Sequence, residues 1–162
     1  MSRYSLRFVK PASIIFWGLS VVGDAGAQHV EAEDPRYRRL AEFFQKNRSP
    51  LQKYAEDFVK VADQYHLDWR LLPSLAMVES GGGRVFARNN VFGWASGRAR
   101  FETIQDGIAY VAKCLAEAAQ YRNKDLRAKL RTYNPARRDY ADTVLRVFSE
   151  ISPEPPVAAL VK

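Results

Sequence analysis

The sequence predicts a mainly helical domain of about six helices packed around one core. Apolar residues recur with the three-to-four-residue spacing of helices along most of the chain between residues 37 and 151. Helix-start signals, such as a serine or threonine before a proline or three residues before an acidic side chain, precede several of these stripes. Residues 81–102 break the pattern, contain five glycines, and are predicted to form a long loop or a short β-hairpin. A loop of this length inside one domain indicates a functional role.

Two helices are predicted before the central part of the chain. The first has Tyr37, Leu40, Ala41 and Phe44 on one face. The second begins at Ser49-Pro50-Leu51-Gln52, which is typical of an N-cap, a first-position proline and a capping-box partner. Its apolar stripe consists of Leu51, Tyr54, Ala55, Phe58, Val61, Ala62 and Tyr65.

The third helix carries a carboxylate on its last turn. Pro73 suits a first helical position, the run to Val78 is almost entirely apolar, and Gly81 with two further glycines ends the helix after Glu79. A carboxylate at a helix C-terminus lies at the negative end of the macrodipole, so its charged form is disfavoured. We therefore predict that Glu79 is a general acid, against the alternative of a solvated glutamate in an ordinary last turn.

Three further helices follow the long loop. Thr103 is predicted to cap the next helix with Asp106 at its third position. A shorter helix is expected over residues 123–133 and ends before Asn134-Pro135. The last helix should end at Ile151, and residues 152–162, which contain three prolines, are predicted to be a disordered tail.

The first 27 residues are typical of a cleavable export signal. Basic residues precede an apolar stretch over 14–22 that is too short to span a membrane, and Ala25-Gly26-Ala27 suits cleavage. An uncleaved anchor is the less favoured alternative. We expect residues 28–151 to form the domain, in the periplasm or outside the cell, without stable membrane insertion after cleavage.

The net charge and the cysteine content limit which partners, disulfides and cofactors are expected. The formal net charge of +7 falls to +5 once Arg3, Arg7, Lys10 and Asp24 leave with the signal, which suits an anionic polymer. Export argues against nucleic acid and favours peptidoglycan. Cys114 is the only cysteine, so no disulfide within the chain is expected, and the two histidines lack metal-ligand spacing with it, so no zinc site is expected. The sequence implies no metal or nucleotide cofactor.

Two motifs carry a resemblance to a known family. Residues 72–83 form a helix ending in Glu79-Ser80-Gly81, and residues 89–94 contain Asn90-Val91-Phe92-Gly93. In this order and spacing they resemble the bacterial glucosaminidase domain of the lysozyme-like superfamily, over roughly residues 51–151. The resemblance implies an α+β lysozyme-like fold. It also implies a peptidoglycan hydrolase of the endo-β-N-acetylglucosaminidase type, which cuts β-1,4 glycosidic bonds with Glu79 as proton donor.

Two tyrosines toward the C-terminal end of the chain resemble sequence elements of the lytic transglycosylases in the same superfamily. These are Tyr133-Asn134 and Tyr140 four residues before Val144. The resemblance implies that both tyrosines line the cleft near the acid, whereas core packing at helical spacing is the alternative. The chain lacks the Gly-Leu-Met-Gln stretch of many transglycosylases, so a lytic transglycosylase giving 1,6-anhydro products is the second choice. A catalytically inactive peptidoglycan-binding module is the third.

Acetylated sugars offer apolar ring faces and amide groups, which suit aromatic and asparagine side chains. The candidate substrate-binding residues are Ser80, Asn90, Phe92, Trp94, Tyr133 and Tyr140. The alternative for Phe92 and Trp94 is that they anchor the loop in the core. This alternative is preferred for Phe92, whereas the cleft is preferred for Trp94. Arginines 84, 88, 98 and 100 suit the carboxylates of peptide stems, or simply make a solvated basic loop.

Glycoside cleavage usually needs a second carboxylate. Glu102 and Asp106 are the nearest acidic candidates after Glu79. Asp106 is better explained as a helix cap, which leaves Glu102 as the candidate second carboxylate. If neither acts, the 2-acetamido group of the substrate can assist, and a single acid suffices.

Overall fold

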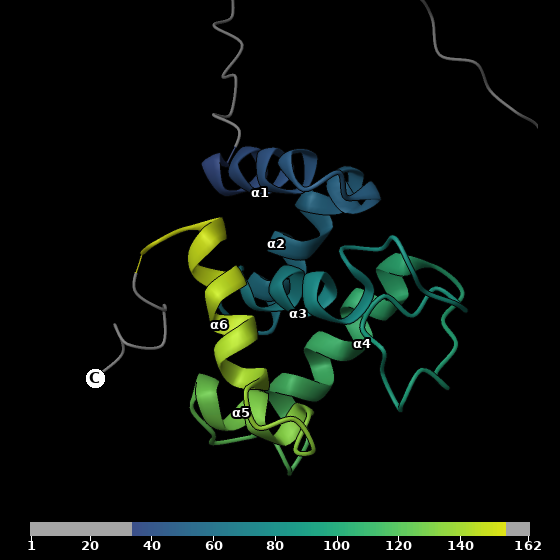
Figure 1. Ribbon diagram of the computed structural model, residues 1–162, viewed down its shortest axis with the longest axis vertical. Helices are drawn as coiled ribbons and strands as arrows, with labels where there is room; N and C mark the ends of the chain where they lie inside the picture. Colours follow the sequence, from purple (N-terminus) through teal and green to yellow (C-terminus); the bar gives the residue numbers. More distant parts are fainter. Residues whose placement is uncertain (1–33, 155–162) are drawn as a thin grey trace, which may run out of the picture. The chain divides into compact units, whose positions relative to one another are not determined.

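The protein is mainly α-helical, as the sequence predicts. The computed structural model describes residues 34–154, so the expected signal peptide and residues 155–162 lie outside the described part. Its elements are α1 (Pro35–Lys46), the 3₁₀ turn η1 (Pro50–Tyr54), α2 (Ala55–Gln64), α3 (Leu71–Ser80), α4 (Ile104–Glu117), α5 (Leu126–Tyr133) and α6 (Tyr140–Ile151), shown in Figure 1. Residues 34–154 contain no β-strand, so the segment between α3 and α4 is a loop without a hairpin. Among these residues, no helix has the length and apolar character needed to cross a membrane.

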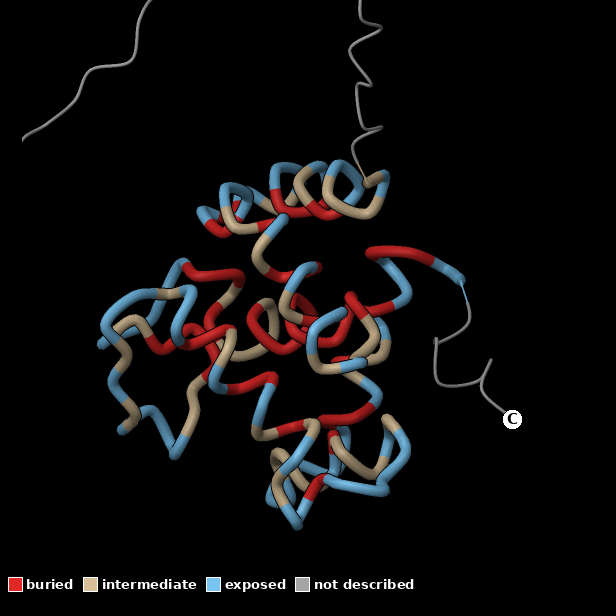
Figure 2. The backbone as a smooth tube through the Cα atoms, turned by 180° about the vertical axis from the view of Figure 1, so that it is seen from behind, coloured by how far each residue is buried: buried red, intermediate tan, exposed pale blue. Residues whose placement is uncertain are grey.

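Helix α3 lies at the centre of the packing. Its residues from Leu71 to Ala76 are all buried, and the helix packs against α2, α4 and α6. Figure 2 shows buried backbone concentrated around this central helix. A helix that is apolar on all sides must be surrounded by other elements, which explains its place. Pro73 is the third helical residue rather than the first, and its missing N–H is still one of the donors that a helix start leaves unpaired.

The start of the second helix differs from the prediction. Ser49 accepts a hydrogen bond from the backbone N of Leu51 at 3.2 Å, and the next five residues form a 3₁₀ turn before α2 begins at Ala55. The Ser49 hydroxyl also donates to the carbonyl of Gly82 at 2.6 Å. This tertiary bond ties the chain before α2 to the end of α3, and the capping box predicted with Gln52 does not form.

Two later helix starts follow their local signals. Thr103 and Asp106 form the predicted capping box at the start of α4. Helix α5 begins at Leu126 with Asp125 as its N-cap, three residues after the predicted start at Asn123. Asn123 has a φ of 64°, a left-handed conformation that cannot continue a right-handed helix.

The folded domain extends past the boundary predicted at residue 152. Ser152 is buried, and its carbonyl accepts a hydrogen bond from the buried Arg70 guanidinium at 2.8 Å. The same guanidinium donates to the Glu154 carbonyl, and Arg39 donates to the Glu154 carboxylate at 3.0 Å. Residues 152–154 are therefore part of the packed domain, because cations from α1 and the start of α3 satisfy their polar groups.

Candidate active site

Glu79 lies on the last turn of α3, where the sequence predicts it. Gly81 ends the helix with a φ of 61°, and the Glu79 side chain is half-buried. The hydroxyl of Tyr140, from α6, donates a hydrogen bond to Oε1 of Glu79 at 2.6 Å. Tyr140 is only 1% exposed, so this carboxylate oxygen is held by a phenol that the core fixes in place.

The second carboxylate oxygen of Glu79 lies against the backbone of Gly93. A Cβ atom placed on Gly93 would lie 2.7 Å from Oε2 of Glu79, closer than side-chain carbons approach an oxygen. Gly93 also has a φ of 60°, which glycine adopts without strain. The site therefore requires glycine at this position for two reasons, and one of them is the carboxylate itself.

Tyr133 and Tyr140 form a stacked pair beside the acid. Their ring centroids are 5.8 Å apart and their planes differ by 4°. The Tyr133 hydroxyl donates to the carbonyl of Phe92 at 2.7 Å, which fixes the peptide that precedes Gly93. Burial raises the pKa of both phenols well above the usual value, and the neighbouring Glu79 charge raises each further. Both phenols are therefore neutral donors across the physiological range.

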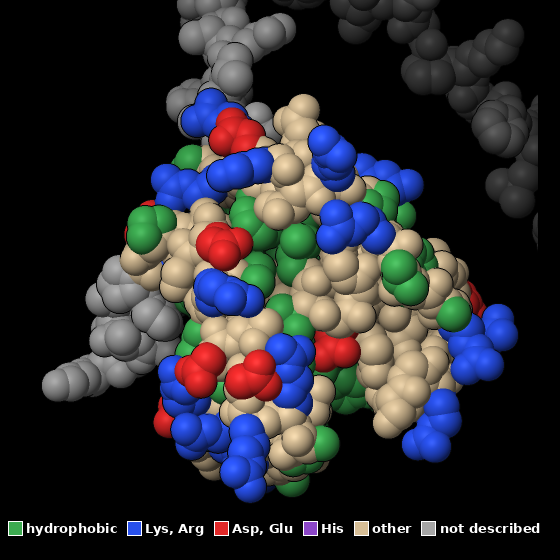
Figure 3. All heavy atoms as spheres, in the orientation of Figure 1, with side chains coloured by type: hydrophobic (Ala, Val, Ile, Leu, Met, Phe, Trp, Pro, Cys, Tyr) green, Lys and Arg blue, Asp and Glu red, His purple; other side chains and the backbone are tan. Residues whose placement is uncertain are grey.

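An aromatic cavity adjoins the carboxylate. It has a volume of about 330 Å³ and is lined by Gly93, Trp94, Ala95, Ser96, Tyr121 and Tyr133. The Trp94 ring contacts Tyr133 at 5.5 Å and Tyr121 at 6.3 Å between centroids. Figure 3 shows this face hollowed between the loop that follows α3 and the helices α5 and α6, with hydrophobic and acidic side chains in the hollow. Gly93 and Tyr133 belong both to the cavity wall and to the surroundings of Glu79, so the cavity and the acid form one site.

Asn90 does not face the cavity, contrary to the prediction. It is 4% exposed, and its amide nitrogen donates to the carbonyls of Trp94 at 3.0 Å and Ala99 at 3.3 Å. Its amide oxygen accepts from the backbone N of Trp94 at 2.9 Å. The side chain is thus fully engaged in holding the loop, because a loop without strands must satisfy its backbone groups with side chains.

Phe92 and Ser80 are also structural rather than substrate-binding by their side chains. Phe92 is fully buried and packs edge-on against Phe58, with 6.3 Å between ring centroids. Ser80 is buried, donates to the Ala76 carbonyl at 2.8 Å, and accepts from the backbone N of Gly83 at 2.9 Å. Its hydroxyl therefore closes the end of α3, next to the acid but without facing a ligand.

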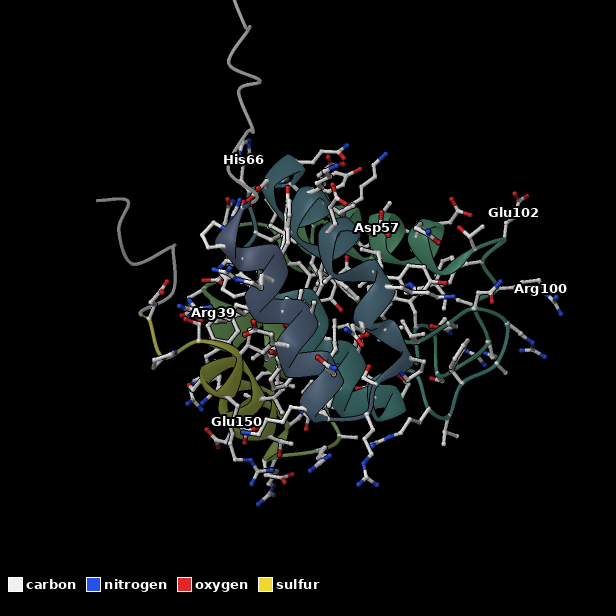
Figure 4. The ribbon with its side chains drawn as sticks, turned by 90° about the horizontal axis from the view of Figure 1, so that it is seen from above. Arg39, Asp57, His66, Arg100, Glu102 and Glu150 are labelled. Atoms are coloured by element: carbon white, nitrogen blue, oxygen red, sulfur yellow. The ribbon has the colours of Figure 1, made fainter. Side chains whose placement is uncertain are left out.

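The structure does not bring Glu102 to the acid. Its side chain is exposed and points outward at the edge of the domain in Figure 4, and within residues 34–154 no hydrogen bond or ion pair joins it to Glu79. Asp106 is engaged with Thr103 at the start of α4, as its role as a cap predicts. In the same described range, no three His, Cys, Asp or Glu side chains are grouped so that they could hold a metal ion.

Of the predicted substrate-binding residues, only Trp94 and Tyr133 line the cavity. Sequence reasoning missed Gly93, whose role depends on a carboxylate fourteen positions earlier, and Tyr121, which follows α4 without a periodic pattern. The Asn90-Val91-Phe92-Gly93 motif could have indicated Gly93, since its glycine directly follows a buried aromatic residue. Nothing in the local sequence marks Tyr121.

Comparison with models of known protein families, with curated proteins and with solved structures finds no match to this chain.

Proposed function

We propose that this domain cleaves the β-1,4 glycosidic bonds of peptidoglycan glycan strands, with Glu79 as the general acid. The observation that carries the proposal is the setting of Glu79. One carboxylate oxygen accepts a hydrogen bond from a buried phenol, and the other lies against Gly93, which is also part of the wall of an aromatic cavity. A carboxyl group held in this way can transfer a proton to one oxygen of a bound glycan.

The cavity suits a chain of acetylated sugars. Its volume is within the range of ligand pockets, and Trp94 and Tyr133 offer ring faces on which the C–H faces of a sugar can stack. The exposed Ser96 in the cavity wall adds a hydroxyl group for acetamido and hydroxyl substituents. The resemblance of the two motifs around Glu79 and Gly93 to glucosaminidase domains supports the same substrate.

A single carboxylate is sufficient when the substrate assists. Glu79 transfers its proton to the glycosidic oxygen, the C1–O bond breaks with its electron pair going to that oxygen, and the acetamido oxygen of the same sugar bonds to C1. Water then attacks C1, the bond between C1 and the acetamido oxygen breaks, and one proton of the water returns to the Glu79 carboxylate. The two candidates for a second carboxylate are placed elsewhere, since Glu102 points outward and Asp106 caps α4, which favours this route.

A lytic transglycosylase is the second candidate. The same single carboxylate favours it, because an internal 6-hydroxyl of the muramic acid residue can replace water. That hydroxyl attacks C1, gives its proton to Glu79, and leaves a 1,6-anhydro end. The stacked pair Tyr133 and Tyr140 beside Glu79 also agrees with the transglycosylase-like sequence elements.

Glu79→Gln tests the proposal, with Glu102→Gln as a matched control. Glutamine retains an oxygen that accepts from Tyr140 but has no proton to transfer, so release of soluble fragments from purified peptidoglycan should fall by at least about 10²-fold. Glu102→Gln should retain wild-type release, and both variants should unfold at the wild-type temperature. Full activity of Glu79→Gln, or equal loss in both variants, would contradict the role of Glu79.

Product analysis separates the remaining possibilities. Mass spectrometry of fragments released by the wild-type protein shows reducing ends for hydrolysis and 1,6-anhydro ends for transglycosylation. A wild-type protein that binds peptidoglycan sacculi and releases no fragments would instead be a non-catalytic binding module.

A further inference from the structure

The loop between α3 and α4 carries two adjacent apolar side chains that face solvent. Val85 is 80% exposed and Phe86 is 40% exposed, and we call these two residues the apolar tip. Within residues 34–154, the only other large hydrophobic side chain with comparable exposure is Tyr110. Neither residue of the apolar tip lines the cavity beside Glu79. The site already described therefore does not account for their exposure.

The apolar tip is presented on an ordered turn. The backbone N atoms of Arg84 and Val85 both donate to the Ser80 carbonyl at 3.0 Å. Gly82 and Gly83 are buried against Ser49 and Leu51, so tightly that a Cβ atom on either glycine would overlap these neighbours. The turn is thus anchored to the folded domain just before the tip, and the exposed side chains cannot retreat into the core without breaking this packing.

Three arginines flank the apolar tip in the same loop. Arg88, Arg98 and Arg100, which we call the arginine rim, are exposed, and within residues 34–154 their side chains make no hydrogen bond or ion pair. The backbone N of Phe101 donates to the Arg88 carbonyl at 3.0 Å, so the two segments that carry the rim lie side by side. Figure 4 shows Arg100 pointing outward at the edge of the domain.

The charge of this surface is almost entirely positive. Between residues 81 and 103, Glu102 is the only acidic residue, against four arginines. Arg84 donates to the Asn47 carbonyl at 3.2 Å and retains its charge. A ligand for this surface must therefore be anionic and must also offer an apolar phase for Val85 and Phe86.

We propose that the apolar tip and the arginine rim dock this domain peripherally on an anionic lipid surface. Phospholipid headgroups provide phosphate for the arginines, and the acyl boundary directly beneath provides an apolar phase for a valine and a phenylalanine. An acidic polymer in water would account for the rim but not for the tip. A protein partner would need a larger apolar area than two side chains. None of the residues of the apolar tip or the arginine rim is among those that line the cavity beside Glu79, although the backbone N of Arg98 donates to the carbonyl of Ala95 in the cavity wall at 3.2 Å.

A fluorescent label at position 85 tests whether the tip enters the lipid. The full chain carries Cys114→Ser, which removes its only thiol, and Val85→Cys labelled with an environment-sensitive fluorophore. A matched protein carries the label at Gln45→Cys, on the exposed face of α1. With vesicles containing phosphatidylglycerol, emission from position 85 should shift to the blue and become protected from an aqueous quencher, and emission from position 45 should not change. The label reports whether position 85 itself enters the lipid, whichever part of the full chain brings the protein to the vesicle.

Matched charge variants test the rim. Replacement of Arg88, Arg98 and Arg100 by glutamine should weaken binding to anionic vesicles by about 10²-fold at low salt, since each cation near the surface contributes about a factor of five. Replacement of three exposed arginines outside the loop, Arg38, Arg122 and Arg146, changes the net charge equally and should have little effect.

Two outcomes overturn the proposal. One is an unshifted label at position 85 on anionic vesicles, and the other is equal weakening by both triple variants. If the rim variant keeps vesicle binding but loses binding to peptidoglycan sacculi, the surface binds the glycan polymer instead.

Discussion

Replacement of Gly93 by alanine should disturb Glu79 directly. The added methyl group would lie 2.7 Å from Oε2 of Glu79, whereas ordinary contact begins near 3.4 Å. The carboxylate must therefore retreat by roughly 0.7 Å, and this movement pulls Oε1 away from the Tyr140 hydroxyl, which now donates to it at 2.6 Å.

The expected loss of stability in Gly93→Ala has two parts. A left-handed alanine costs about 1–2 kcal/mol of stability relative to glycine. Loss of a hydrogen bond to a charged group, with the buried phenol left unpaired, costs about 1.5–3 kcal/mol more. We expect Gly93→Ala to lower the free energy of unfolding by about 3–5 kcal/mol. Displacement of the acid by this distance should also lower peptidoglycan cleavage by about 10²-fold.

Gly97→Ala is the matched control. Gly97 also has a positive φ, of 77°, but no atom lies within 4 Å of a Cβ placed there. Its replacement should cost only the backbone part, about 1–2 kcal/mol, and leave cleavage near the wild-type rate. Urea unfolding of both variants, of Glu79→Ala, and of Gly93→Ala combined with Glu79→Ala isolates the contact. In the Glu79→Ala protein, Gly93→Ala should lower stability by no more than Gly97→Ala does in the wild type. Equal destabilisation of the two single variants would refute the proposed contact between Gly93 and Glu79.

Three further predictions concern the loop beside the site, the two tyrosines at Glu79 and the C-terminal residues of the domain. Asn90→Ala should lower the free energy of unfolding by about 2–4 kcal/mol and expose residues 81–103 to limited proteolysis, because three hydrogen bonds are lost. The control is Asn134→Ala, whose side chain makes no hydrogen bond within residues 34–154 and which should have neither effect. A loop that stays resistant to protease in Asn90→Ala would contradict the role of Asn90 in holding it. The raised pKa values of Tyr133 and Tyr140 keep both phenols protonated in the folded state while the unfolded state ionises near pH 10, so their contribution to stability is complete below that pH and declines above it. Urea unfolding should show up to a tenfold gain in the unfolding equilibrium constant per pH unit for each phenol, and Tyr140→Phe should flatten this dependence; an unchanged slope would count against it. Arg70→Met should lower the free energy of unfolding by about 3–5 kcal/mol, because it removes a partner of the buried Asp68 carboxylate and the donor to the carbonyls of residues 152 and 154. Arg38→Met, on the exposed face of α1, should change the free energy of unfolding little in the same measurement.

Local signals in the sequence were sufficient for most of the helices. The capping box at Thr103, the apolar character of α3 and the glycines after Ser80 act through residues that are neighbours in the chain, so their effect can be predicted from the chain alone. Predictions failed where a tertiary bond competes with a local one. Ser49 bonds to Gly82 instead of closing a capping box, and Arg70 holds residues 152–154 that composition alone assigns to a tail.

The sequence by itself determined the helical class, the place of Glu79 on the last turn of α3 and the long loop that follows. Only the tertiary structure decided which side chains of that loop face the cavity. Asn90 and Trp94 have equally suitable chemistry for a sugar, yet one is turned into the loop and the other lines the cavity. Their directions depend on the path of the loop, and that path depends on contacts between residues far apart in the chain, such as Tyr133 with Phe92 and Tyr140 with Glu79. No local spacing carries that information, because burial and ligand contact call for the same aromatic and amide side chains.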